Sequence, residues 1–153
     1  MSGRRTLAVV ATALAAAGAL SGTVRVLAGE SSSDVEVTAA WIRWLPADLP
    51  AGAYLTLHNR ASHPVTLIGA SSADYAEVSL HRSVNQGGTS TMQPVHEIRL
   101  RPGESVSFAA GGYHLMLERP SIAIHPGDHV PITLHFAGGS SLTASFEVRQ
   151  PDS

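Results

Sequence analysis

Short stretches in which apolar and polar residues alternate fill most of the chain from Asp34 onward. The two clearest are Val130-x-Ile132-x-Leu134-x-Phe136 and Leu142-x-Ala144-x-Phe146-x-Val148, with Gly138-Gly139 between them. An alternation of period two predicts strands that bury one face, and two glycines between such strands favour a tight turn. No helical period of comparable length follows the N-terminal region. The pattern therefore predicts an all-β fold that closes with this pair of strands.

Glycine, proline, asparagine and aspartate punctuate the rest of this region, as they do in β-sandwiches. Loops are predicted at Leu45–Pro50, Asn59–Pro64 and Pro102-Gly103, and a longer loop over Arg82–Thr91 that turns at Asn85-Gln86-Gly87-Gly88. The remaining predicted strands are Val35–Trp41 with Val35, Val37, Ala39 and Trp41 on one face, Ala53–Leu57 with Tyr54, Thr56 and His58 on the opposite face, Val65–Ala70, Tyr75–Leu80, Ile98–Leu100, Val106–Phe108 and the segment from Gly111 to Leu117.

The N-terminus has the plan of a secretory signal peptide. Arg4-Arg5 precede an apolar run from Thr6 to Leu20, which is shorter than the roughly 20 residues of a membrane-spanning helix. Val26-x-Ala28 offers a cleavage site, and an uncleaved anchor is the alternative. We expect a signal peptide over residues 1–28, a flexible lead-in over 29–34, one domain over 35–149 and a tail over 150–153. The protein should then be periplasmic or extracellular, with no membrane insertion after cleavage.

The net charge and the absence of cysteine exclude several classes of function and partner. The chain has no cysteine, which leaves no disulfide, no bacterial lipid attachment and no thiolate for a blue-copper or copper-A electron-transfer centre. After cleavage seven arginines and no lysine face twelve acidic residues, a net charge of about −5. Nucleic acid and anionic membranes are therefore not expected partners. Gly103-Glu104-Ser105 does not form a hydrolase nucleophile elbow, and the protein is not expected to be an enzyme.

Two methionines besides Met1 occur, and each stands at a short interval from a histidine. The order is His81, ten residues, Met92, twenty-one residues, His114, one residue, Met116. Imidazole and thioether donors without thiolate or carboxylate suit Cu(I). In an extended strand His114 and Met116 share one face while Leu115 and Leu117 share the other. The spacing predicts a Cu(I) site that holds one ion per chain.

Each of these residue types also has a structural interpretation. Methionines commonly fill cores and histidines are commonly solvated. Among the other histidines, His129 and His135 are predicted at the surface, His63 and His125 in turns before prolines, and His96 as a reserve ligand. Tyr113, Trp41 and Trp44 are expected to pack, although a tryptophan near Cu(I) would also shield it from water.

Four segments carry a resemblance to a known family: Val78-Ser79-Leu80-His81, Met92-Gln93-Pro94-Val95, Gly111-Gly112-Tyr113-His114-Leu115-Met116 and Gly127-Asp128-x-Val130-Pro131-Ile132-Thr133-Leu134-x-Phe136. Together with the spacing, they resemble the periplasmic copper chaperones that serve the copper-A centre of cytochrome c oxidase. The likeness runs from Val35 to Val148. Ser79 and Gln93 depart from it, since many relatives carry Glu and Arg or Lys there.

The resemblance implies a cupredoxin-like Greek-key β-sandwich with His81, Met92, His114 and Met116 as the ligands of one Cu(I). It implies a metallochaperone that passes copper to a cytochrome c oxidase subunit or to another copper protein of oxidase assembly. We expect the protein to be a monomer. Two alternatives stay open. One is a copper-buffering or resistance protein with the same ligands, and the other is a structural β-sandwich without metal.

Overall fold

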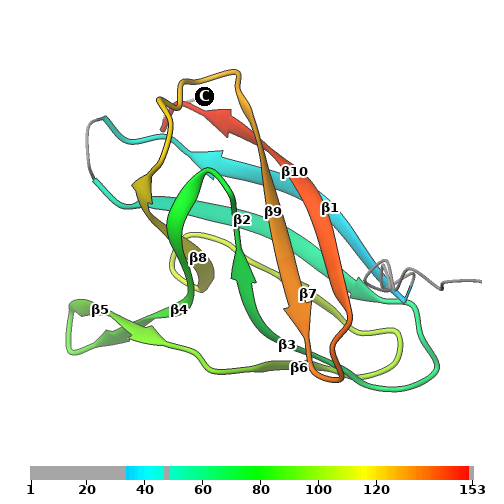
Figure 1. Ribbon diagram of the computed structural model, residues 1–153. Coiled ribbons are helices and arrows are strands. Elements are labelled where there is room, and N and C mark those ends of the chain that lie inside the picture. Colours follow the sequence, from blue (N-terminus) through cyan, green and yellow to red (C-terminus); the bar gives the residue numbers. More distant parts are fainter. Residues whose placement is uncertain (1–33, 47–48, 152–153) are drawn as a thin grey trace, which may run out of the picture.

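The computed structural model describes residues 34–46 and 49–151, and every regular element in those ranges is a β-strand (Figure 1). The predicted signal peptide and most of the lead-in lie outside the described residues. Within the described residues no helix is long and apolar enough to span a membrane. The strands are β1 (Val35–Arg43), β2 (Ala51–Asn59), β3 (Val65–Ser71), β4 (Tyr75–Gln86), β5 (Thr89–Pro94), β6 (Ile98–Leu100), β7 (Ser105–Ser107), β8 (Tyr113–Pro120), β9 (His129–Phe136) and β10 (Ser141–Arg149).

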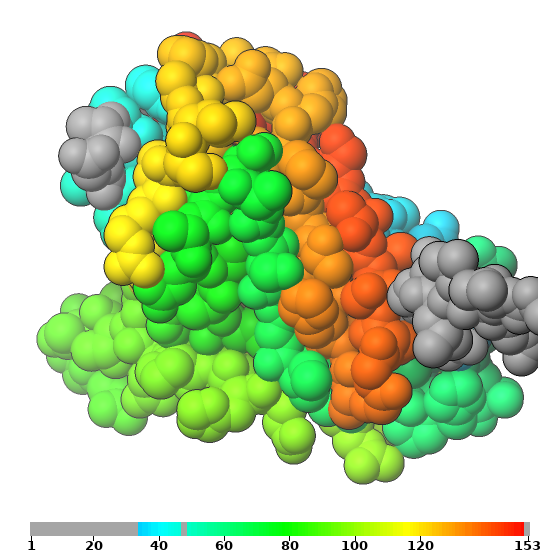
Figure 2. Space-filling view, viewed as in Figure 1, coloured from blue at the N-terminus to red at the C-terminus, as the bar shows by residue number. Residues whose placement is uncertain are grey.

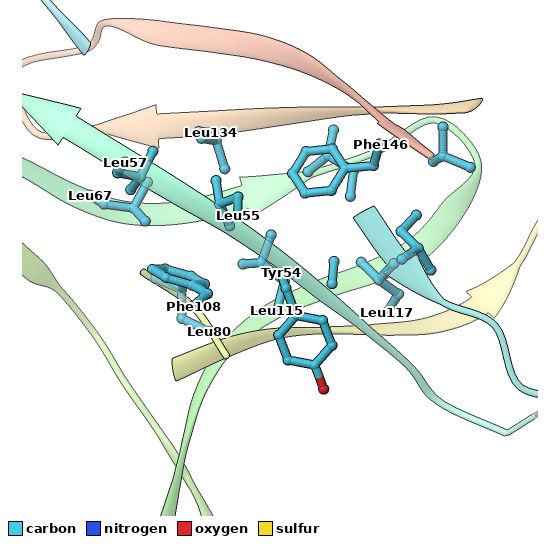
Figure 3. Packing of buried hydrophobic residues seen from close by; sticks show 14 of the residues in the cluster. Tyr54, Leu55, Leu57, Leu67, Leu80, Phe108, Leu115, Leu117, Leu134 and Phe146 are labelled. Carbon is cyan, nitrogen blue, oxygen red and sulfur yellow. The ribbon is translucent and has the colours of Figure 1, made fainter. Parts of the chain in front are cut away.

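The strands form one continuous hydrogen-bonded path in the order β5-β4-β8-β2-β1-β10-β9-β3-β6, with β7 added beside β2. Neighbours pair antiparallel except β1 and β10, which run parallel. The path folds over so that β3 and β9 contribute to the same apolar cluster as β2 (Figure 3). This is the predicted cupredoxin-like β-sandwich.

The core follows the predicted alternation most closely in the last two strands. In β9 the side chains of Val130, Ile132, Leu134 and Phe136 are all buried. In β10 Phe146 and Val148 are fully buried or nearly so. The two strands pair antiparallel across Gly138-Gly139, whose φ angles of 93° and 92° are favourable only for glycine. The alternating pattern thus places these strands correctly because it reports burial directly.

The first strand departs from its predicted face. Ala39 has a φ of 51°, and the pairing of β1 with β2 shifts between Thr38 and Trp41. This bulge inserts an extra residue, so the alternation changes phase. Val35 is buried before the bulge, and Ile42 is fully buried after it. Trp41 therefore faces outward, against the prediction that it shares a face with Val35.

The segment between His81 and Met92 also differs from its prediction. Arg82–Thr91 is not a loop: β4 continues to Gln86, β5 begins at Thr89, and only Gly87-Gly88 turns the chain. The φ angles of these glycines are 59° and 80°, which matches a two-residue type I′ hairpin. All six residues of β5 are exposed, so the sequence offers no apolar alternation by which this strand could be recognised.

Asn59, at the end of β2, joins the loop that follows β2 to the end of β6 and the loop after it, and it is fully buried. Its Nδ2 donates to the backbone carbonyls of His63, Leu100 and Arg101 at 2.9, 3.2 and 3.1 Å. Its Oδ1 accepts from the backbone N–H of Ala61 at 2.9 Å. The Asn59 side chain therefore fixes the predicted turn after β2, because it supplies hydrogen-bond partners to these backbone groups.

Candidate metal site

The four predicted ligands come from three adjacent strands. β4 lies between β5 and β8, and its residue His81 is the cross-strand partner of His114. Two residues to either side along β4, Ser79 is paired with Met116 and Ser83 with Met92. Residues directly opposite in a sheet, and residues two apart in a strand, project to the same face. The register therefore puts His81, Met92, His114 and Met116 on one face.

The other face of the same strands belongs to the core. Leu115 and Leu117 of β8 are fully buried, and Leu80 of β4 is nearly so. Figure 3 shows Leu80, Leu115 and Leu117 within the apolar cluster. β8 therefore has two faces as predicted, with Leu115 and Leu117 on the core face and His114 and Met116 on the opposite one. Core packing fixes the backbone from which the two histidines and Met116 project.

The two imidazoles lie close together with unused nitrogen atoms. Their ring centroids are 5.8 Å apart and the rings are tilted by 38°. Nδ1 of His81 and Nε2 of His114 are buried and have no hydrogen-bond partner. Nδ1 of His114 lies 3.4 Å from the carbonyl oxygen of Gly112, a long contact. When Nδ1–H donates to that carbonyl, Nε2 presents a lone pair, which is the arrangement of a histidine that binds a metal.

The electrostatics of His114 favour its neutral form. Its side chain is 6% exposed, and burial lowers its pKa below the ordinary histidine value. The contact with Gly112 opposes this shift, while the nearby His81 adds to it. A neutral imidazole is the form that binds a metal ion, so His114 does not have to lose a proton at neutral pH.

The site opens into a cleft of about 390 Å³. Three of the predicted ligands, Met92, His114 and Met116, line this cleft. Met92 is the most accessible of them, with 61% of its surface exposed. The other lining residues are Arg43, Leu45, Pro50, Ala51, Gly52, Tyr54, Ser83, Ala110 and Gly111. No carboxylate lines the cleft among the described residues.

The remaining histidines lie elsewhere. His96 is exposed between β5 and β6 and does not line the cleft. His58 and His135 contact the hydroxyls of Ser105 and Ser71, each at 2.7 Å. Within residues 34–46 and 49–151, no three His, Cys, Asp or Glu side chains come together as a metal site.

The polar and aromatic residues of the cleft wall, Arg43 and Tyr54, and Gly52 between them were not predicted as site residues. Arg43 stands beside the predicted Leu45–Pro50 loop, and nothing in its local sequence distinguishes it. Of the tryptophans, Trp41 packs against Tyr54 with ring centroids 4.9 Å apart. The indole N–H of Trp44 donates to the carbonyl of Ile124 at 2.9 Å. These aromatic side chains therefore pack, as the sequence predicted.

Solved structures share this architecture. A copper-bound PCuAC domain from PmoF2 has a TM-score of 0.65 at 27% identity, over 80% of this chain and 98% of that one. The apo PmoF2 domain has a TM-score of 0.62 at 28% identity, over 78% and 93%. The Cu(I) form of DR1885 from Deinococcus radiodurans has the same fold, with a TM-score of 0.62 at 24% identity over 80% and 84%. The shared fold is that of a β-sandwich domain of the PCuAC type, which confirms the predicted family resemblance.

Within this class the chain belongs to the LpqE-like family, described as putative lipoproteins, whose family model matches residues 35–148. A curated relative, the putative lipoprotein Lxx21020 of Leifsonia xyli subsp. xyli, is 28% identical over 122 residues. That match covers 79% of this chain and 73% of the relative.

Proposed function

We propose that this protein is an extracytoplasmic copper metallochaperone that binds one Cu(I) through His81, Met92, His114 and Met116. The observation that carries the proposal is the pair of buried, unpartnered nitrogens on His81 and His114, on the same sheet face as two thioethers. Buried polar atoms without partners are uncommon, and a bound ion would satisfy both of them. The copper-bound PmoF2 domain, with 27% identity and a shared fold, supports copper as the ion.

The chemistry of the donors favours the monovalent ion. Thioethers are soft and uncharged, and neutral imidazole adds no charge. Because the ligands supply no negative charge, the site favours the monovalent Cu(I) over the divalent Cu(II). Four such donors complete a tetrahedral shell and leave no open position for reaction with a substrate. The site then holds and exchanges copper without performing catalysis.

The proposed client is the copper-A centre of cytochrome c oxidase, reached directly or through another assembly protein. Its thiolates would bind Cu(I) more tightly than thioethers do. The proposed location is the periplasm or outer surface, which the names of the family and of the relative as putative lipoproteins support. Residues 1–153 contain no cysteine, so none of them can carry a lipid through a thioether. We propose that the signal peptide predicted over residues 1–28 exports the protein and that it acts as a monomer.

An anaerobic Cu(I) titration against a chromophoric competitor tests the ligand set. The wild-type protein should bind one equivalent tightly, and Met92→Leu and Met116→Leu should each weaken binding by orders of magnitude. His96→Gln is the matched control, because His96 is exposed and away from the cleft. Binding that is indifferent to both methionine changes would overturn the proposal.

A transfer experiment separates a chaperone from a copper buffer. Copper-loaded protein is mixed with the reduced, metal-free copper-A domain of an oxidase, and the absorbance of the reconstituted centre is followed after oxidation. A chaperone should transfer Cu(I) to the domain faster than a small chelator of equal Cu(I) affinity does. Transfer no faster than from that chelator would favour the buffering alternative.

A further inference from the structure

Arg43, Gly52 and Met116 form one row across three neighbouring strands. Arg43 of β1 is paired with Gly52 of β2, and Gly52 is paired with Met116 of β8. Paired residues project to the same face, so the side chains of Arg43 and Met116 stand on one face, about 10 Å apart at their Cα atoms by the spacing of strands. Gly52 has no side chain, which leaves a gap between the arginine and the proposed ligand that the Tyr54 side chain partly fills.

The hydroxyl of Tyr54 lies over this gap. A Cβ atom added to Gly52 would stand 3.1 Å from Tyr54 Oη and 3.4 Å from Cζ. The ring of Tyr54 packs against that of Trp41, with the two ring centroids 4.9 Å apart. Figure 3 shows the Tyr54 oxygen directed away from the apolar cluster. Because Gly52, Tyr54 and Met116 all line the same cleft, this hydroxyl is a donor placed beside the proposed ligands.

Arg43 brings an uncompensated positive charge to the cleft. No carboxylate forms an ion pair with it among residues 34–46 and 49–151. The acidic residue on the same face of the adjacent strand is Glu147, the cross-strand partner of Trp41. Glu147 is already bound by Arg149, whose Nε and Nη2 donate to it at 2.9 and 2.7 Å. With neutral ligands, the part of the cleft wall that the structure describes would place two positive charges and no negative one around a bound Cu(I).

We propose that Arg43 and the Tyr54 hydroxyl form an anion-accepting subsite for the copper-binding group, a thiolate or carboxylate, of the molecule that exchanges Cu(I) with this protein. The subsite rests on the proposed function and adds the chemistry of the exchange partner to it. The incoming anion forms a bond to Cu(I) while a thioether leaves. The ion stays Cu(I), no electron moves, and the thiol proton is lost to solvent before the thiolate enters. The guanidinium and the hydroxyl stabilise the negative charge beside the ion during this exchange.

Stopped-flow transfer of Cu(I) to two chelators tests the subsite. Bicinchoninate carries carboxylates, whereas neocuproine is uncharged. Arg43→Gln should slow transfer to bicinchoninate by about tenfold and leave the rate with neocuproine unchanged, because only the anion is attracted. Tyr54→Phe should slow the bicinchoninate reaction by about threefold, as expected for one hydrogen bond. Added salt should reduce the bicinchoninate rate of the wild type and hardly affect that of Arg43→Gln.

Arg99→Gln is the matched control, because Arg99 is exposed on β6, at the opposite end of the strand order from the hairpin. An equal effect of Arg99→Gln and Arg43→Gln, or an equal effect of Arg43→Gln on both chelators, would overturn the subsite. So would unchanged rates in an Arg43→Gln protein that binds Cu(I) normally. Absence of Cu(I) binding by the wild type would instead overturn the proposed function, and the subsite with it.

A second arm identifies the source of the anion. The same variants are tested with a reduced copper-A domain as acceptor and with glutathione as a small thiol. A slower transfer to the domain assigns the subsite to a protein thiolate. A slower transfer to glutathione alone assigns it to small copper carriers.

Discussion

His81 and His114 are direct cross-strand partners whose rings lie 5.8 Å apart, each with one buried nitrogen that has no hydrogen-bond partner. Neither atom is satisfied within the described residues, although the surrounding backbone is regular sheet. An unsatisfied buried polar atom costs about 1 to 3 kcal/mol, so this pair lowers the stability of the metal-free protein. A ligand that bridges the two rings would recover that free energy.

The stability of the metal-free protein should decline in acid through His114. Burial lowers the pKa of His114 in the folded state, so between the folded and unfolded pKa values the unfolded chain binds more protons. This destabilisation of the folded state is absent above the ordinary histidine pKa of about 6.5, and it grows as pH falls from there to the lower pKa of the folded state. Denaturant unfolding at pH 8, 6 and 5 should show a smaller decline in His114→Gln than in the wild type. His96→Gln should decline like the wild type, and an identical decline in all three would contradict the prediction.

Cu(I) affinity should also fall with pH. Protons compete with the metal for both imidazoles, whereas thioethers do not titrate in this range. Competition titrations between about pH 8 and 5 should give progressively weaker binding below the histidine range near roughly 6.5. Because the pKa of His114 is lowered, its share of the loss should come at the acid end. An affinity that stayed constant over this interval would argue against imidazole ligands.

Core and site substitutions should separate stability from binding. Phe146 is fully buried, so Phe146→Ala should cost about 3 to 5 kcal/mol of unfolding free energy. Met92 is 61% exposed, and Met92→Ala should change that free energy by less than about 0.5 kcal/mol while weakening Cu(I) binding. Denaturant unfolding of the metal-free proteins measures the two unfolding free energies, and the competition titration measures Cu(I) binding. A large loss of stability in Met92→Ala would show that the methionine packs in solution.

Asn59→Asp should destabilise the fold in a pH-dependent way. The change places a carboxylate against three carbonyl oxygens that now accept from Nδ2, which should cost more than about 2 kcal/mol at pH 7. The deficit should shrink toward pH 4, because protonation of the buried carboxyl restores one donor. Asn85→Asp, at an exposed position of β4, is the control and should be nearly neutral. Equal effects of the two changes would rule out the role assigned to Asn59.

Gly52→Ala should disturb the cleft without disturbing the fold. The backbone of Gly52 lies outside the left-handed region, so alanine is tolerated, but its methyl would press on Tyr54 Oη at 3.1 Å. Unfolding free energy should fall by less than about 1 kcal/mol, while transfer of Cu(I) to bicinchoninate slows because the hydroxyl is displaced. Gly69→Ala has open space around its Cβ and should alter neither quantity. Transfer rates that match in both variants would mean that the gap over Gly52 is not used.

Much of the sandwich could be predicted because its strands bury alternate residues. The buried positions of β9 are the apolar positions of the sequence, and the glycines between β9 and β10 mark the turn. The intervals from His81 to Met116 singled out four side chains that the sheet register then places on one face. Such a pattern is visible in sequence because it depends on rare residue types.

The cleft could not be predicted, since it depends on pairing between distant segments. Arg43 and Met116 are brought into one row by β2, and the bulge at Ala39 sets which face Trp41 and Arg43 occupy. One extra residue in a strand reverses every later side chain, and an alanine with a positive φ leaves no sequence signal. The hairpin was missed for another reason: β5 is exposed along its whole length and so lacks apolar alternation.

The exposed hairpin gives the four proposed ligands unequal freedom. His81, His114 and Met116 project from strands that are sealed on their reverse side by Leu80, Leu115 and Leu117. Met92 stands on the outermost strand of the path, hydrogen-bonded to β4 alone and exposed on every residue. If the four proposed ligands bind copper, Met92 is the donor whose strand constrains it least and the one we expect to leave the ion first. An incoming partner would therefore replace one thioether while three ligands on the core-backed strands still hold the ion.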